Sequence, residues 1–174
     1  MNSSATLALT FGLLAFSAVA VSAGADAPSN GAKVDAMVKS LAVAPARTLG
    51  KAASYCTANH QPAGQALDAR LKTYVAAMSA GTREAMLEIA KTDPAFLQST
   101  PPYSGKDYEM MDKQAETILQ QVQASPADGC AKLGTTLDAG NSAFFKDYTL
   151  QGYREYQAKR AQYCARSPKP ANCN

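Results

Sequence analysis

Histidine is almost absent from this chain of 174 residues, which contains only His60. A single imidazole excludes metal sites built from several histidines and any mechanism that needs two imidazoles. His60 follows Cys56 by four residues, so on a helix the pair could bind a metal or act as nucleophile and base. Because Pro62 should end that helix and Cys56 is expected in a disulfide, we favour a capping or exposed histidine.

Sequence motifs of common catalytic sites are also absent. The chain has no Cys-x-x-Cys, His-Glu-x-x-His or Gly-x-Ser-x-Gly motif and no phosphate-binding glycine loop. These absences argue against thioredoxin-like redox chemistry, c-type haem attachment and most exported hydrolases. We therefore predict a protein that is not an enzyme and that needs no cofactor and no metal. An enzyme that uses Asp, Glu or Tyr without histidine remains an alternative.

Patterns typical of β-strands are scarce as well. No β-branched run alternates with polar residues at a period of two, and no Asn-Gly or Asp-Gly turn separates two such runs. Apolar residues instead recur at helical spacing along most of the chain, and alanine is abundant, which favours helices and their close packing. The sequence therefore predicts an all-α, single-domain bundle of about five to seven helices.

One long apolar run occurs, and it lies at the N-terminus. It covers residues 7–21 and is followed by several small residues. This pattern predicts a signal peptide over residues 1–23, cleaved after Ala23 or Ala25, and hence a periplasmic or secreted protein. The rival interpretation is an uncleaved membrane anchor, although the run is short for a span of about 20 residues. No later run approaches membrane length, so we expect no membrane span after cleavage.

Four cysteines follow the predicted signal peptide, and an even number in an exported chain indicates two disulfides. Three pairings are conceivable, and we favour Cys56–Cys130 together with Cys164–Cys173. The second pair closes a short loop that contains two prolines and can turn the tail back onto the preceding helix. Loop-closure entropy gives about 3 kcal/mol for the short loop and about 4.5 kcal/mol for the long one.

The first expected helices follow a polar linker. This linker covers residues 24–31, and the helical domain is expected to fill residues 32–174. Apolar residues at helical spacing predict a first short helix that includes residues 34–41. Pro45 interrupts that pattern and is predicted to open a second helix, because proline suits the first helical turn.

A third helix is predicted from a continuous apolar stripe over residues 67–78. Gly81 is expected to end it, and Thr82 is expected to cap a fourth helix that stops at residues 93–94, Asp-Pro. After a loop rich in proline and glycine, Asp107 is expected to begin a long helix.

The last two expected helices have clear boundary residues. Residues 125–126, Ser-Pro, end the long helix and begin the next one, which Gly140 ends. Asn141 or Ser142 is expected to cap the last helix, which runs to about Arg166. Its predicted apolar stripe contains Phe145, Tyr148, Gly152, Tyr156 and Tyr163.

An acidic stripe is expected on the long helix, where Glu109, Asp112 and Glu116 stand at helical spacing. Such carboxylates could hold Ca²⁺ or perform acid–base chemistry. Lys106 and Lys113 interleave with them, however, so we interpret the stripe as a solvated helix face. A docking surface for a basic partner is the alternative.

The C-terminal part of the chain is rich in cations and tyrosines, although the net charge of the whole chain is only +3. Its cations are Lys146, Arg154, Lys159, Arg160, Arg166 and Lys169, and its anions are Asp147 and Glu155. Tyrosine together with arginine is typical of binding hot spots. The loop over residues 99–106 adds a further aromatic side chain. The predicted partner-binding residues are Tyr103, Tyr153, Arg154, Tyr156, Lys159 and Arg160.

Export, two disulfides, a helical body and the lack of a catalytic set predict a non-enzymatic binding protein. It would act on a protein partner in the periplasm or outside the cell by occluding a surface, as an inhibitor, an immunity protein or an adaptor does. The alternative is a carrier that holds a small apolar ligand between its helices. An anionic glycan is kept as an alternative partner, whereas the mild net charge does not predict nucleic-acid binding.

Overall fold

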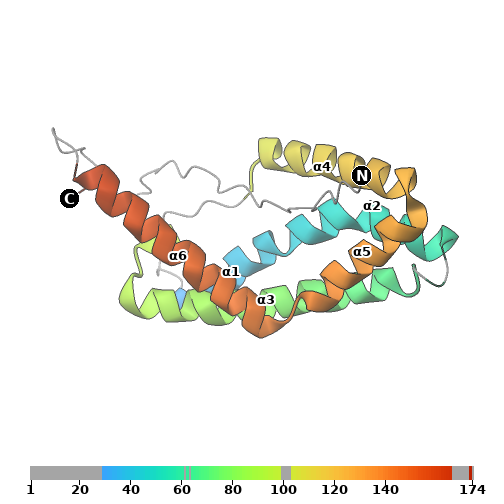
Figure 1. Ribbon diagram of the computed structural model, residues 1–174. Coiled ribbons are helices and arrows are strands. Elements are labelled where there is room, and N and C mark those ends of the chain that lie inside the picture. The colour runs from blue at the N-terminus through green and yellow to red at the C-terminus, as the bar shows by residue number, and fades with distance from the viewer. Residues whose placement is uncertain (1–28, 61, 63, 99–102, 166–172, 174) are drawn as a thin grey trace, which may run out of the picture.

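The computed structural model describes residues 29–60, 62, 64–98, 103–165 and 173. These residues form six α-helices and one short 3₁₀-helix and contain no strand, which confirms the predicted all-α fold (Figure 1). The elements are α1 (Asn30–Leu41), α2 (Val43–Asn59), α3 (Leu67–Thr92), η1 (Phe96–Gln98), α4 (Gly105–Ala124), α5 (Pro126–Ala139) and α6 (Ser142–Cys164). The predicted signal peptide lies outside the described residues, as do Arg166 and Lys169.

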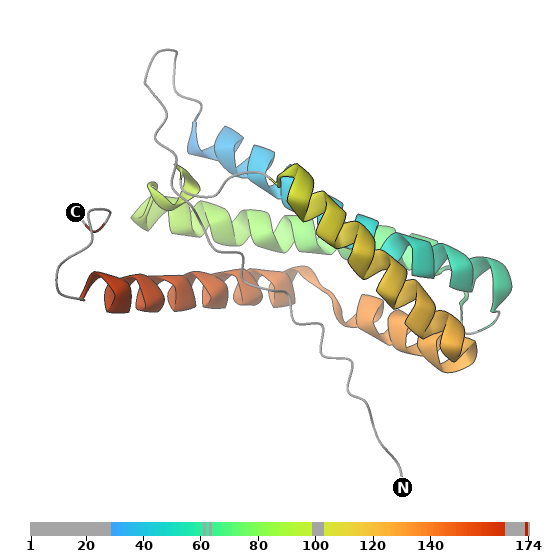
Figure 2. The ribbon, with the colours of Figure 1, turned by 90° about the horizontal axis from the view of Figure 1, so that it is seen from above.

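The longest helix, α3, has 26 residues and runs along most of the bundle, about 39 Å at 1.5 Å per residue. Its N-terminal half shares one hydrophobic core with α2, α4, α5 and the start of α6. Its C-terminal half shares a second core with α1, η1 and the middle of α6. Figure 2 shows α6 along one edge of the helical body, beside α3.

Two disulfides stabilise this arrangement at different places. Cys56 and Cys130 are fully buried in the first core, where their disulfide joins α2 to α5. The second disulfide links Cys164, at the end of α6, to Cys173 in the C-terminal tail. Both predicted pairings are therefore confirmed, and two disulfides are typical of an oxidising, extracellular-type compartment.

Pro45 explains why α1 and α2 are separate helices. Proline has no N–H to donate to the carbonyl of Leu41, and its ring clashes with that group, so the helix is interrupted at Ala42. Pro45 lies in the first turn of α2, as predicted. Helix α1 begins at Asn30, where Ser29 provides the cap, so the end of the segment predicted as a linker is helical.

The break predicted at Gly81 and Thr82 is wrong, because α3 continues through both residues. A Cβ atom at Gly81 would overlap the backbone oxygen of Ser142 and would lie 2.9 Å from the backbone nitrogen of Lys146. Glycine at this position therefore lets the backbone of α6 lie directly against α3 and does not end a helix. Asp93 does end α3, as predicted.

The other predicted helix boundaries are confirmed to within about two residues. Helix α4 begins where the carboxylate of Asp107 accepts a hydrogen bond of 2.7 Å from the backbone N–H of Ser104. Helix α5 begins at Pro126, and Gly140 follows its last residue. Asn141 caps α6, because its side chain accepts a hydrogen bond from the backbone early in that helix.

Most of the apolar stripe predicted for the last helix is not buried. Phe145 alone is buried in α6, whereas Tyr148 and Tyr163 are 52% and 41% exposed. The reason is that α6 lies at an edge of the body, where it packs on α3 and on Phe96 of η1. A helix at an edge buries only a narrow face, so most of the predicted apolar stripe stays partly or fully exposed.

Candidate functional site

Three exposed cations gather in the second half of α6. We call Arg154, Lys159 and Arg160 the basic tip. Figures 1 and 2 show that the C-terminal end of α6 extends past the helices beside it. Lys159 and Arg160 lie in the last two turns of α6, whereas Arg154 lies in the middle of the helix, next to Tyr153, which bonds to Asp93 at the end of α3.

The arginines of the described residues fall into two groups. Arg47, Arg70 and Arg83 each form an ion pair with a carboxylate of another helix, namely Asp112, Asp138 and Asp35. Arg154 and Arg160 are exposed and form no ion pair within the part of the chain that the structure describes. Their guanidinium groups are therefore available to carboxylates of another molecule.

Tyr153 and Tyr156, which were predicted to bind a partner, are half-buried against the body. The hydroxyl of Tyr153 donates a hydrogen bond of 3.0 Å to Asp93, and its ring centroid lies 5.0 Å from that of Phe96. Burial, followed by the hydrogen bond with Asp93, raises the pKa of Tyr153. Tyr156 also packs on Phe96, at 5.3 Å between ring centroids. These two tyrosines thus hold α6 in place and contribute less to its exposed face than predicted.

Tyr103 lies next to the N-terminus of α4, a helix that packs on α2 and α5. Its ring centroid is 6.2 Å from that of Tyr108, and burial raises the pKa of Tyr103. The guanidinium carbon of Arg47 lies 5.0 Å from the ring centroid of Tyr108. Tyr103 thus belongs to the region where α4 meets α2, and the structure does not bring it together with the other predicted binding residues.

Two exposed aromatic residues of α6 were missed as candidate binding residues. Phe144 is 53% exposed and Tyr148 is 52% exposed, and their rings stack with centroids 6.2 Å apart. For Phe144 the sequence contains a weak signal, because it lies about 100° around the helix from the buried Phe145 and only a wide apolar face would bury both.

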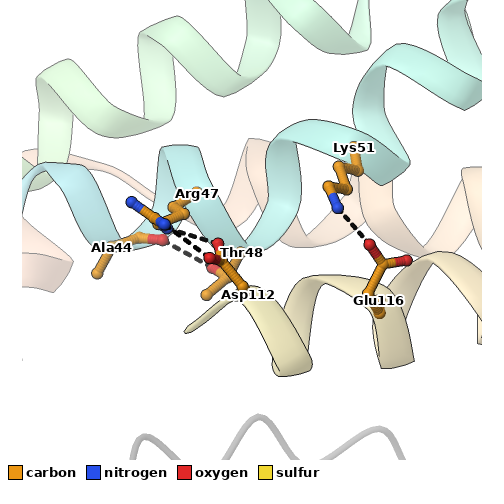
Figure 3. Close-up of polar contacts among 6 residues, drawn as sticks. All are labelled: Ala44, Arg47, Thr48, Lys51, Asp112 and Glu116. Carbon is orange, nitrogen blue, oxygen red and sulfur yellow. Dashed lines mark hydrogen bonds and ion pairs between the residues drawn. The ribbon is translucent and has the colours of Figure 1, made fainter. Parts of the chain in front are cut away.

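The acidic stripe of α4 is not simply a solvated face. Asp112 accepts hydrogen bonds of 2.5 Å and 2.6 Å from Arg47, and Glu116 forms an ion pair with Lys51, so both carboxylates join α4 to α2 (Figure 3). The hydrogen bonds from Arg47 lower the pKa of Asp112. Glu109 remains exposed. The basic partner of this stripe is therefore a helix of the same chain.

His60 is the C-terminal cap residue of α2, as predicted. Its Nε2 atom lies 3.0 Å from the hydroxyl of Tyr55, with which it forms a hydrogen bond. Cys56 is bonded to Cys130, so its sulfur is not available as a metal ligand or a nucleophile. The alternative of a reactive Cys56–His60 pair is thereby excluded.

In the part of the chain that the structure describes, the His, Cys, Asp and Glu residues form no group of three or more that could hold a metal ion. None of its helices combines the length and the apolar character that a membrane crossing requires. Comparisons with protein-family models, curated proteins and solved structures find no match for this chain.

Proposed function

We propose that the protein is a non-enzymatic binding protein of the periplasm or the extracellular space, and that its basic tip binds a protein partner with clustered carboxylates. The supporting observation is that Arg154 and Arg160 are exposed without an ion pair in the described part of the chain, while the other described arginines are paired. A guanidinium binds a carboxylate through two parallel N–H donors, which gives the contact direction as well as energy.

The contacts that attach α6 to the rest of the bundle support this proposal. Phe145 is buried and packs edge-on against Tyr74, with ring centroids 5.0 Å apart. Lys146 forms an ion pair of 2.7 Å with Glu84 of α3, and Tyr153 bonds to Asp93. Because these contacts fix the helix before binding, a partner need not order it, which lowers the entropic cost of association.

The two disulfides support a site of action outside the cytoplasm, together with the predicted signal peptide. An exposed helix with unpaired arginines is suited to cover an acidic surface of a partner. An inhibitor, an immunity protein or an adaptor would act by such occlusion, and none of these roles needs a catalytic group.

Capture of partners by the oxidised mature protein tests the proposal. Wild-type protein is compared with the triple variant Arg154→Glu, Lys159→Glu and Arg160→Glu. The matched control, with the same change of net charge at exposed sites on other helices, is Lys72→Glu, Lys106→Glu and Lys113→Glu. We expect one stoichiometric protein partner that the wild type and the control bind, that the tip variant loses, and that binds less tightly as salt is raised.

Two outcomes would count against this proposal. A partner that binds the tip variant as well as the wild type would show that the basic tip is not the binding surface. A small apolar molecule or an anionic glycan that copurifies in place of a protein would instead support one of the alternatives. Circular dichroism of all variants shows whether the fold is retained.

A further inference from the structure

The exposed face of α6 has the residue spacing of a helix–helix seam. Six exposed residues follow one another at alternating steps of four and three, the repeat found in coiled coils. We call Phe144, Tyr148, Gln151, Glu155, Ala158 and Gln162 the outer strip. Helix α3 packs on the face of α6 that carries the buried Phe145, and no other α-helix of the described residues makes more than a weak contact with α6.

We infer that the outer strip binds the outer strip of a second copy of this chain, in antiparallel orientation about a two-fold axis level with Tyr153. In this register Tyr148 faces Ala158 of the second copy, so a large side chain lies against a small one. The amide of Gln151 donates a hydrogen bond of 3.1 Å to Glu155 of its own helix, and its second N–H faces the carboxylate of Glu155 of the second copy, which can accept it. A parallel arrangement would place the two Glu155 carboxylates against each other, which is unfavourable.

The charges beside the outer strip fit the same register. Lys159 of the second copy lies level with residue 147 and on the same side of the strip as Tyr148, so its ammonium can reach the tyrosine ring. On the other side, the two Arg154 side chains approach each other. Each of them lies between Asp147 and Glu155 of the second copy, and these carboxylates offset the repulsion between the guanidinium groups.

The size of the contact sets the expected strength. One pair of helices about 27 Å long makes a contact below about 1,200 Å² in total, which is typical of weak, transient association. The inference goes beyond the proposed function and needs no other molecule, so the protein alone can test it.

Sedimentation of the oxidised wild-type protein from about 10 μM to about 1 mM is the first measurement. We expect the average mass to rise from that of a monomer toward that of a dimer. Gln151→Lys should tighten association several-fold, because the new ammonium faces Glu155 of the second copy. In a parallel pair the same change would weaken association by placing lysine against lysine. Gln120→Lys, an equal change of charge on the exposed side of α4, should leave association unchanged.

A complementation experiment then tests the seam itself. In the proposed register, residue 151 of each copy faces residue 155 of the other. Gln151→Glu therefore places two carboxylates against each other at both of these contacts, and the double variant Gln151→Lys and Glu155→Lys places two ammonium groups there. Each variant alone should remain monomeric, and their mixture should form a heterodimer. A wild type that stays monomeric up to about 1 mM would overturn the inference, as would folded variants that do not associate when mixed. A tighter dimer for the single Gln151→Glu variant would also contradict it.

Discussion

At the scale of single residues, two glycines inside helices have opposite surroundings. Gly81 lies in α3 where the backbone of α6 approaches, and a Cβ atom there would overlap backbone atoms that cannot move independently. Gly50 lies inside α2, and a Cβ atom there would meet no other atom within 4 Å. The same substitution should therefore have opposite effects at the two positions.

Gly81→Ala should lower the free energy of unfolding by about 1–3 kcal/mol, because α6 must shift away from α3 to accommodate the methyl group. Gly50→Ala should raise it by about 0.5–1 kcal/mol, because alanine favours the helix and restricts the unfolded chain. Urea denaturation of the wild type and of both variants measures these two changes in the free energy of unfolding. Equal effects of the two substitutions would show that α6 does not need the close approach at Gly81.

At the scale of helices, α4 is attached to α2 by apolar and charged contacts together. Met111 and Ala115 of α4 are buried, while the ion pair of Arg47 with Asp112 has side chains that are 39% and 49% exposed. Exposed ion pairs contribute little energy, because water already solvates both charges. The apolar contacts therefore supply most of the attachment, and the ion pairs favour this alignment of α4 on α2.

The Arg47–Asp112 ion pair should make stability depend on pH. Hydrogen bonds from Arg47 lower the pKa of Asp112 in the folded protein, so the unfolded chain binds a proton at higher pH than the folded one. The stabilisation is therefore complete above the ordinary pKa of about 3.9 and is lost as pH falls through the lower, folded-state pKa.

The variant Asp112→Asn should be less stable than the wild type at neutral pH, and the difference should shrink in acid. Urea midpoints of both proteins between about pH 7 and about pH 2.5 measure this convergence. Glu109→Gln is the control, since Glu109 is exposed and forms no ion pair within the described residues. A difference between wild type and Asp112→Asn that stays constant with pH would rule out this role of the ion pair.

At the scale of the whole molecule, the two disulfides hold different parts. Cys56 and Cys130 are fully buried and join helices 74 residues apart in the sequence. Cys164 and Cys173 are partly exposed and join the end of α6 to the tail, nine residues away. A thiolate must reach a sulfur atom to exchange with it, so exposure determines which disulfide reacts first.

Mild reductant should open Cys164–Cys173 first and leave the helical circular dichroism unchanged. Alkylation and mass mapping during a dithiothreitol titration show the order of reduction. Replacing Cys56 and Cys130 by alanine should lower the free energy of unfolding by about 4.5 kcal/mol, the loop-closure value for this separation. Reduction of the buried disulfide first, in folded protein, would contradict the difference in access.

The features that the sequence determined by itself are local ones. The start of α5 at Pro126 and the cap of α6 at Asn141 depend on residues within one turn, and the pairing of Cys164 with Cys173 follows from a short loop. The exposure of Arg154, Lys159 and Arg160 was also predictable from the sequence, because charged side chains stay solvent-exposed unless they are paired. The all-α fold and most helix boundaries were predictable because helical periodicity and boundary residues are also local, and the break expected at Gly81 is the exception.

The tertiary structure decided what depends on neighbouring helices. Gly81 has the sequence context of a helix end, yet the approach of α6 gives it a packing role in the middle of α3. Tyr148 follows an apolar stripe, yet it is exposed because α6 lies at an edge of the body. Periodicity shows that a helix has an apolar face, but burial depends on how many helices surround it, and only the packed chain specifies that number.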